Sequence, residues 1–218
     1  MKKYKLTTET LQFAGRTLHR IKAVKDFDSI KAGEFGGWIE NEKNLSQDDN
    51  AWIYGDAMVF DNAEVYDNAE VYGNAKVYGN ANVFGNAKVY GNANVFGYAE
   101  VYGNANVSGN ANVSGNAEVS DYAEVSDYAK VYGNAAIKGD AKVHDAVDYI
   151  VFKNFWSSGR YFTWTSSNNK WSVGCFYGTG EELIKKAYAD SEKSGREYER
   201  VVRYVESILA DEKKEKSN

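Results

Sequence analysis

Residues 51–146, which begin AWIYGDAMVFDNAEVYDN and end AAIKGDAKVHDA, are built from hexapeptides. Sixteen hexads follow one another without a gap. Their first position is always Ala, and their third is Val except at Ile53 and Ile137. Ala and Val separated by one variable residue give the alternation of a short strand that buries every second side chain. Gly or Asp at the fifth position supplies a turn, because both residues tolerate positive φ angles. The period therefore predicts stacked short strands joined by sharp turns.

The hexads resemble the repeats of the left-handed parallel β-helix, in which three strands form one triangular coil. The resemblance implies columns of Val and Ala inside about five coils. The absence of Pro agrees with this fold, because Pro would remove a hydrogen bond from the ladder. Pentapeptide and calcium-binding repeats have other periods and do not fit. The expected fold class is mainly β: a single-stranded left-handed parallel β-helix with an N-terminal β cap and a small C-terminal α+β module.

The segment before the hexads, residues 1–50, is expected to form the N-terminal cap, because an open β-helix end carries unpaired backbone groups. The run RTLHRIKAV alternates like a strand, and EFGGWIENEKNLS is interpreted as a Gly turn followed by irregular coils. Ile39 and Leu45 in this segment are already six residues apart. A two-residue slip before Ala51 separates them from the regular hexads.

The segment after the hexads, residues 147–212, is expected to form the α+β module. Three runs, DYIVFKNF, GRYFTWTS and KWSVGCFY, are predicted strands. Two helices are predicted from capping-box spacings, Thr179 with Glu182 and Ser194 with Glu197. The second helix would pack one apolar stripe on the small sheet: Tyr198, Val201, Val202, Val205, Ile208 and Leu209. Residues 213–218 are predicted to be a frayed tail.

The net charge of −5 and the pI near 5.2 argue against a broad attraction to nucleic acid or to anionic membranes. Cys175 is the single cysteine, which excludes an intramolecular disulfide and fits a reducing compartment. No signal peptide and no long apolar run is found in the sequence. We therefore expect a cytoplasmic protein with neither a membrane nor a nucleic-acid partner.

Residues able to carry chemistry are few. His144, at the fourth position of the last hexad, is either a surface base or an exposed side chain that contacts the cap. His19 lies in the predicted cap strand and is interpreted as structural, and Cys175 has no recognisable His partner and is expected to be buried in a strand. No cofactor or metal site is predicted. The Gly residues recur in phase with turns, and four Asp residues at the same position are interpreted as turn caps: Asp61, Asp67, Asp121 and Asp127.

The fourth position carries aromatic residues in the first nine hexads and Ser in the next four. Residues eighteen apart would stack, so three aromatic columns are expected: Tyr54, Tyr72 and Tyr90; Phe60, Tyr78 and Phe96; and Tyr66, Phe84 and Tyr102. Two interpretations stay open. The rings either stabilise one another or also form a surface for a partner or a carbohydrate. With Trp164 and Trp171 of the module, they are the candidate binding residues.

The GGWIE opening, the YGNA-type hexads and the closing WSVGCFYGT together resemble a family of bacterial and phage-encoded hexapeptide-repeat proteins. These proteins belong to the trimeric acyltransferase-like β-helix superfamily and are often described as transferases or polymer-forming proteins. The resemblance covers nearly the whole chain and implies a homo-oligomer, with a trimer favoured. The zinc site of the β-helical carbonic anhydrases needs three His ligands, and this chain has two His residues.

Three functions follow as hypotheses. The first is a non-catalytic scaffold that presents its C-terminal module to a protein or small-molecule partner. The second is an acyltransferase with an atypical site, in which His144 would be the base. The third is a phage-encoded inhibitor of host defence that captures a small molecule or a host protein.

Overall fold

The computed structural model describes residues 2–215 and separates into two compact units, Met1–Asp148 and Tyr149–Asn218. Within the described residues, no helix is both long and apolar enough to span a membrane.

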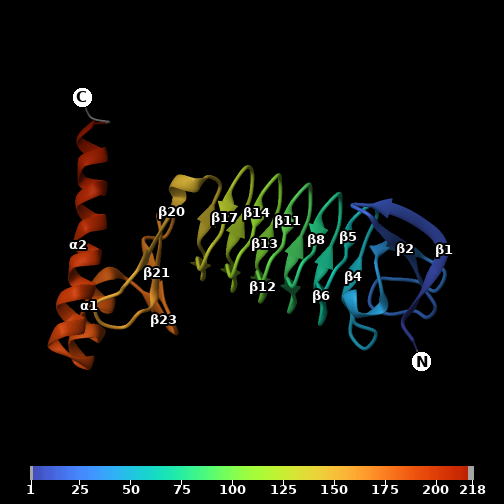
Figure 1. Cartoon of the computed structure of the whole chain (residues 1–218), viewed down its shortest axis with the longest axis horizontal. Coiled ribbons are helices and arrows are strands. Elements are labelled where there is room, and N and C mark those ends of the chain that lie inside the picture. The colour runs from blue at the N-terminus through green and yellow to red at the C-terminus, as the bar shows by residue number, and fades with distance from the viewer. Residues whose placement is uncertain (1, 216–218) are drawn as a thin grey trace. The chain divides into compact units, whose positions relative to one another are not determined.

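The first unit is dominated by the hexads (Figure 1). Each hexad of residues 51–146, all of which the structure describes, contributes one two-residue strand at its second and third positions. These strands are β4 (Trp52–Ile53), β5 (Met58–Val59), β6 (Glu64–Val65), β7 (Glu70–Val71), β8 (Lys76–Val77), β9 (Asn82–Val83), β10 (Lys88–Val89), β11 (Asn94–Val95), β12 (Glu100–Val101), β13 (Asn106–Val107), β14 (Asn112–Val113), β15 (Glu118–Val119), β16 (Glu124–Val125), β17 (Lys130–Val131), β18 (Ala136–Ile137) and β19 (Lys142–Val143).

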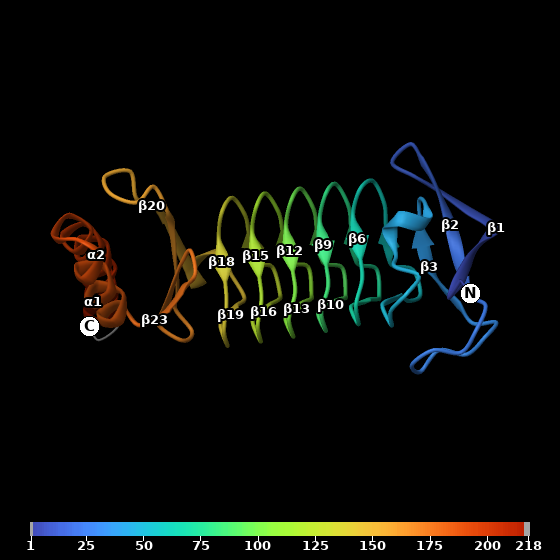
Figure 2. The same ribbon diagram turned by 90° about the horizontal axis from the view of Figure 1, so that it is seen from below.

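The strands pair in parallel with a spacing of eighteen residues and form three sheets. The β4 face contains β4, β7, β10, β13, β16 and β19; the β5 face contains β5, β8, β11, β14 and β17; and the β6 face contains β6, β9, β12, β15 and β18. Figure 2 shows the β6 and β4 faces as ladders of successive coils. Between coils the backbone bonds are regular: the N–H of Tyr72, for example, donates to the carbonyl of Val89 at 3.0 Å. The predicted left-handed parallel β-helix is confirmed.

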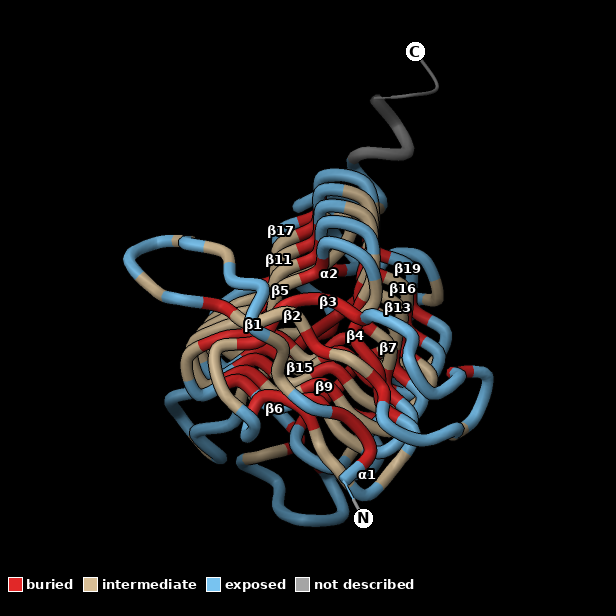
Figure 3. The backbone as a smooth tube through the Cα atoms, turned by 90° about the vertical axis from the view of Figure 1, so that its right-hand side faces the viewer, coloured by how far each residue is buried: buried red, intermediate tan, exposed pale blue. Residues whose placement is uncertain are grey.

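The interior of the coils is filled by the first and third positions of the hexads. Each Ala and each Val or Ile at these positions is fully buried, or nearly so, and Figure 3 shows the buried residues in red along the inside of the coils. Burying one Val side chain contributes about 1.5–3 kcal/mol, so the repeated Val column is the main source of stability.

The turns depend on the fifth position. Gly85, for example, has a φ of 70°, and a Cβ there would lie 2.9 Å from the backbone nitrogen of Gly103 in the next coil. Asp replaces Gly at positions 61, 67, 121 and 127, again with positive φ. The carboxylate of Asp61 accepts a hydrogen bond from the N–H of Gly79 at 3.2 Å, and Asp67 accepts one from Gly85 at 3.1 Å. The interpretation of these two Asp residues as turn caps is therefore confirmed.

The N-terminal part of this unit contains a hairpin of β1 (Tyr4–Phe13) and β2 (Arg16–Ala23), then β3 (Phe35–Ile39) and the short 3-10 helix η1 (Glu42–Asn44). β3 pairs antiparallel with β2 and parallel with β5, where Trp38 lies opposite Met58. The parallel ladder therefore begins at β3, and the expected boundary at residue 50 lies inside an irregular first coil. This first coil brings the solenoid to about six turns.

The irregularity of the first coil has a local cause. Ile39 pairs with Val59 and Leu45 with Val65, each twenty residues away, so the predicted two-residue slip is confirmed. Gly37 takes the place of the usual Ala, because a Cβ there would lie 2.5 Å from Ile53 Cγ2.

The second unit is a four-stranded antiparallel sheet and two helices. The sheet order is β20 (Tyr149–Lys153), β21 (Tyr161–Thr165), β22 (Lys170–Val173), β23 (Phe176–Gly178), and the helices are α1 (Gly180–Asp190) and α2 (Glu192–Glu215). Ahead of it, the 3-10 helix η2 covers Ala146–Asp148.

Two details of this unit differ from the predictions. The third predicted strand is two strands, because Gly174 adopts a φ of 58° and turns the chain between Val173 and Phe176. The capping box of Thr179 is confirmed. The cap predicted at Ser194 is wrong, because α2 already begins at Glu192 and the hydroxyl of Ser191 accepts a hydrogen bond from the N–H of Ser194 at 3.1 Å.

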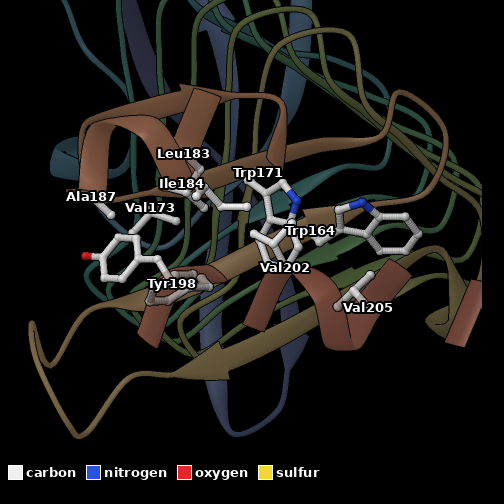
Figure 4. Packing of buried hydrophobic residues seen from close by; sticks show 10 residues of the cluster. Trp164, Trp171, Val173, Leu183, Ile184, Ala187, Tyr198, Val202 and Val205 are labelled. Carbon is white, nitrogen blue, oxygen red and sulfur yellow. The ribbon is translucent and has the colours of Figure 1, made fainter. Parts of the chain in front are cut away.

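The core of the second unit lies between the sheet and the helices (Figure 4). It contains Phe162, Trp164, Trp171 and Val173 from the strands, and Leu183, Ile184, Ala187, Tyr198, Val202 and Val205 from the helices. Val201 and Leu209 pack against this cluster, so the predicted apolar stripe of α2 is confirmed except at Ile208, which is half-buried outside the cluster. Residues 213–215, predicted as frayed, continue α2, and residues 216–218 lie outside the described residues.

Candidate functional site

The three aromatic columns form as predicted. Tyr72 and Tyr90 stack with ring centroids 4.8 Å apart and an interplanar angle of 4°. In the other two columns every pair is stacked at 4.9–5.0 Å, whereas Tyr54 meets Tyr72 edge-on at 6.4 Å. These columns are Tyr54, Tyr72 and Tyr90; Phe60, Tyr78 and Phe96; and Tyr66, Phe84 and Tyr102.

The stacking limits what the columns can bind. Because the faces of the rings are covered by their neighbours, a ligand would meet mainly ring edges. Partial burial, together with neighbouring charges, raises the pKa of Tyr66, Tyr72 and Tyr78 above the usual value; for Tyr78 the neighbouring charge is Asp61. These phenols stay protonated at neutral pH and can donate hydrogen bonds.

His144 belongs to a small polar cluster at the end of its corner of the solenoid. Its Nδ1 lies 2.7 Å from Ser126 Oγ and 3.1 Å from Asp127 Oδ2, and its backbone N–H donates to Asp148 Oδ2 at 2.7 Å. Within residues 2–215, its Nε2 has no hydrogen-bond partner. Contacts at Nδ1 fix the ring, and the side chain is 51% exposed; a ring held at Nδ1 with a second nitrogen within reach of solvent is the arrangement that a general base requires. Ser126 contacts the same nitrogen as Asp127, so these residues do not form a nucleophilic triad.

The other two chemistry-bearing candidates lie elsewhere. His19 is in β2, and its Nδ1 is 3.4 Å from the carbonyl oxygen of Thr7, which fits its structural interpretation. Cys175 is exposed in the turn between β22 and β23, and not buried in a strand as expected, because Gly174 turns the chain at this point. Among the described residues, no group of three or more His, Cys, Asp or Glu residues is placed to hold a metal ion.

The two candidate tryptophans of the second unit are core residues. Trp164 is 3% exposed and Trp171 is 2% exposed, and the indole N–H of Trp164 donates to Asn169 Oδ1 at 2.9 Å. Both side chains lie on the helix-facing side of the sheet, which removes them from the candidate binding surface.

A groove that the sequence reasoning missed lies between β20 and α2. It has a volume of about 390 Å³ and is lined by Phe152, Asn154, Trp156, Glu197, Arg200, Val201 and Tyr204. Trp156 and Tyr204 are 65% and 56% exposed. The sequence did contain a signal, because two aromatic residues in the turn-rich segment NFWSSG have no place in a core.

The outward second positions give the three solenoid faces different charges. The β5 face carries Met58, Lys76, Asn94, Asn112 and Lys130, whereas the β6 face carries Glu64, Asn82, Glu100, Glu118 and Ala136. On the β4 face the charges are compensated within the chain, because Lys88 pairs with Glu70 at 3.1 Å and Lys142 with Glu124 at 3.2 Å. On the β6 face, Lys138 pairs with Glu118 at 3.2 Å. The hydrogen bond from Lys88 to Glu70 raises the pKa of Lys88.

The coils, turns and stacked columns define a hexapeptide-repeat β-helix. No family model matches the sequence. The chain is similar to a protein of Escherichia coli strain K12 described as the uncharacterized acetyltransferase YdcK, with 39% identity over 62 residues. That match covers 25% of this chain and 19% of the relative, so the chain spans about a fifth of the relative's length.

Proposed function

We propose that the chain is a non-catalytic scaffold that assembles side by side into a homotrimer and presents its C-terminal module to a partner. The observation that carries the proposal is the difference in charge between the solenoid faces. The β5 face carries Lys76 and Lys130, and the β6 face carries Glu64, Glu100 and Glu118, of which Glu118 already pairs with Lys138 at 3.2 Å; on the β4 face the charges pair with one another along the strand ladder.

In a closed ring with threefold symmetry, one face of each protomer meets a different face of the next. The β5 face of one copy would then lie against the β6 face of its neighbour at the same height. Lys76 follows Glu64 by two hexads. This offset equals two thirds of a coil, about 3 Å at the usual strand spacing, so the two side chains can meet across the contact between copies. Such exposed pairs contribute little affinity but select the orientation of the partner.

Size-exclusion chromatography with light scattering tests this assembly. We expect a trimer that dissociates with Lys76→Glu. Adding Glu64→Lys to the same chain exchanges the two charges and should restore the trimer. The control, Lys88→Glu with Glu70→Lys on the β4 face, should leave the mass unchanged. A monomer at every concentration and salt level would contradict the proposal.

A second candidate function is acyl transfer, favoured by the open Nε2 of His144 and by the similarity to a protein described as an acetyltransferase. Here Nε2 would take the proton of an acceptor amine or hydroxyl, whose nitrogen or oxygen attacks the thioester carbonyl, and the leaving thiolate would be protonated. Acetyl-coenzyme A should then raise the melting temperature, and His144→Ala should abolish acetyl transfer. The absence of a melting shift with acetyl-coenzyme A would count against this function.

A further inference from the structure

We infer that the groove between β20 and α2 binds an extended peptide, which adds as a strand to the free edge of β20 and places an apolar side chain between the aromatic residues. This inference names the kind of partner that the presented module would bind, and to that extent it rests on the proposed function. The binding site itself lies wholly within the second unit.

The first support is the backbone of β20, which is the edge strand of its sheet and, among the strands of residues 2–215, has β21 as its one neighbour. The N–H of Asn154 donates to the carbonyl of Arg160 at 2.9 Å, in the same register that places Phe152 opposite Phe162. Because bonded and non-bonded pairs alternate in an antiparallel ladder, even-numbered residues of β20 bond to β21. Val151 and Lys153 therefore direct their N–H and C=O groups to the open edge, where a further strand can pair with them.

The second support is the apolar groove beside this edge. Phe152 comes from β20, Trp156 from the loop that follows it, and Val201 and Tyr204 from the flank of α2. The rings of Phe152 and Tyr204 meet edge-on at 6.0 Å. A strand on the open edge would direct alternate side chains towards these residues, and the volume of about 390 Å³ accommodates one or two of them.

The charges around the groove indicate what the peptide carries. Arg200 and Glu197 form an ion pair at 2.7 Å, but the Arg200 side chain is 71% exposed and that of Glu197 only 20%. Lys153 follows Phe152 in β20, so its side chain lies on the opposite face of the sheet and does not line the groove. The more exposed charge at the groove is that of Arg200, which favours an acidic residue next to the apolar one.

The polar side chains of the groove fit a peptide better than a carbohydrate. Asn154 Oδ1 accepts hydrogen bonds from the N–H groups of Trp156 and Ser157, and its Nδ2 donates to Ser157 Oγ. Glu197 is held by Arg200. Few side-chain groups remain to bind sugar hydroxyls, whereas the outward backbone groups of β20 match an extended chain.

The test uses a displayed library of random seven-residue peptides, selected on the full-length protein. We expect enriched peptides that alternate apolar residues and contain Asp or Glu. Fluorescence anisotropy then measures the binding of a labelled consensus peptide to two matched pairs of variants. Val151→Pro removes an outward N–H, whereas Val151→Thr keeps it; Tyr204→Ala removes a groove ring, whereas Tyr204→Phe keeps it. We expect affinity to fall at least about tenfold in the first member of each pair and to stay within about twofold in the second.

Several results would overturn the inference. They are the absence of any enriched peptide, equal binding by both members of the Tyr204 pair, or glycan-array binding that is lost in Tyr204→Ala without peptide enrichment. Thermal melting checks the fold of Val151→Pro, and if that variant unfolds, the Tyr204 pair decides. Light scattering on the same samples separates the two proposals. A monomer that binds peptide contradicts only the trimer, and a trimer that enriches no peptide contradicts only the groove.

Discussion

Phe84 lies in the middle of an aromatic column and offers a direct test of the stacking. Its ring is 4.9 Å from Tyr66 on one side and 4.9 Å from Tyr102 on the other, with interplanar angles of 4° and 6°. Phe84→Ala removes two stacked pairs, each contributing about 0.5–1 kcal/mol. It also exposes about 100 Å² of apolar surface at about 25 cal/mol per Å². We therefore expect a loss of about 3.5–4.5 kcal/mol in the free energy of unfolding.

The matched variant is Tyr102→Ala, at the end of the same column, where only one stacked pair is lost. Its cost should be smaller by about 0.5–1 kcal/mol, the contribution of the second pair. Urea unfolding followed by circular dichroism of the β-sheet signal measures both variants. Two results would show that stacking does not stabilise the columns. One is a loss of unfolding free energy in Phe84→Ala no larger than in Tyr102→Ala, and the other is a change in the mass of the assembly without a change in stability. Either result would support the partner-surface interpretation.

Three further predictions concern the solenoid. Gly85→Ala should lower the free energy of unfolding by about 2–4 kcal/mol, because it combines positive φ with a clash. At Gly55, φ is 60° but the space around a Cβ is open, so Gly55→Ala should lower the free energy of unfolding by only about 1–2 kcal/mol. Equal urea midpoints for the two variants would refute the clash. Ser114→Tyr would join Phe96 and Tyr132 into one column and should raise the melting temperature, whereas a lower one would show that the Ser positions cannot take a ring. Burial lowers the pKa of the Lys3 ammonium to about 8, below the unfolded value of about 10.4. The unfolded chain then binds more protons in this range, so the free energy of unfolding should rise with pH between about 8 and 10. Lys3→Met should remove this rise, and an unchanged pH profile in the variant would contradict the assignment.

Most of the solenoid was predictable from the sequence, because the residue types within each hexad indicate which of its side chains are buried. Ala and Val at fixed positions determine which side chains point inward, and Gly or Asp determines where the chain turns. The two-residue slip was also visible, since Ile39 and Leu45 carry the period before residue 51. The first coil was harder to predict, because Gly37 occupies the position at which the regular hexads have Ala. Gly is needed there because Ile53 leaves no room for a Cβ.

The second unit was less predictable because its pattern is not repeated. The turn at Gly174 inside KWSVGCFY and the helix cap at Ser191, three residues before Ser194, both depend on local backbone geometry. Trp164 and Trp171 were candidate binding residues, but aromatic strand residues do not reveal which side of a sheet the helices cover. The groove and the Nδ1 contacts of His144 join residues that are distant in sequence, and only the folded chain brings them together.

The return of the chain to the same face after eighteen residues has a consequence for length variation. Loss or gain of one complete coil would move the exit of the solenoid by about 4.8 Å along its axis and leave the exit on the β4 face, where β19 lies. Loss of a single hexad would instead transfer the exit to the β6 face and rotate the following chain by a third of a turn. Insertions and deletions in multiples of three hexads would therefore preserve the direction in which the chain leaves the solenoid, and the repeat can act as a spacer adjustable in fixed steps.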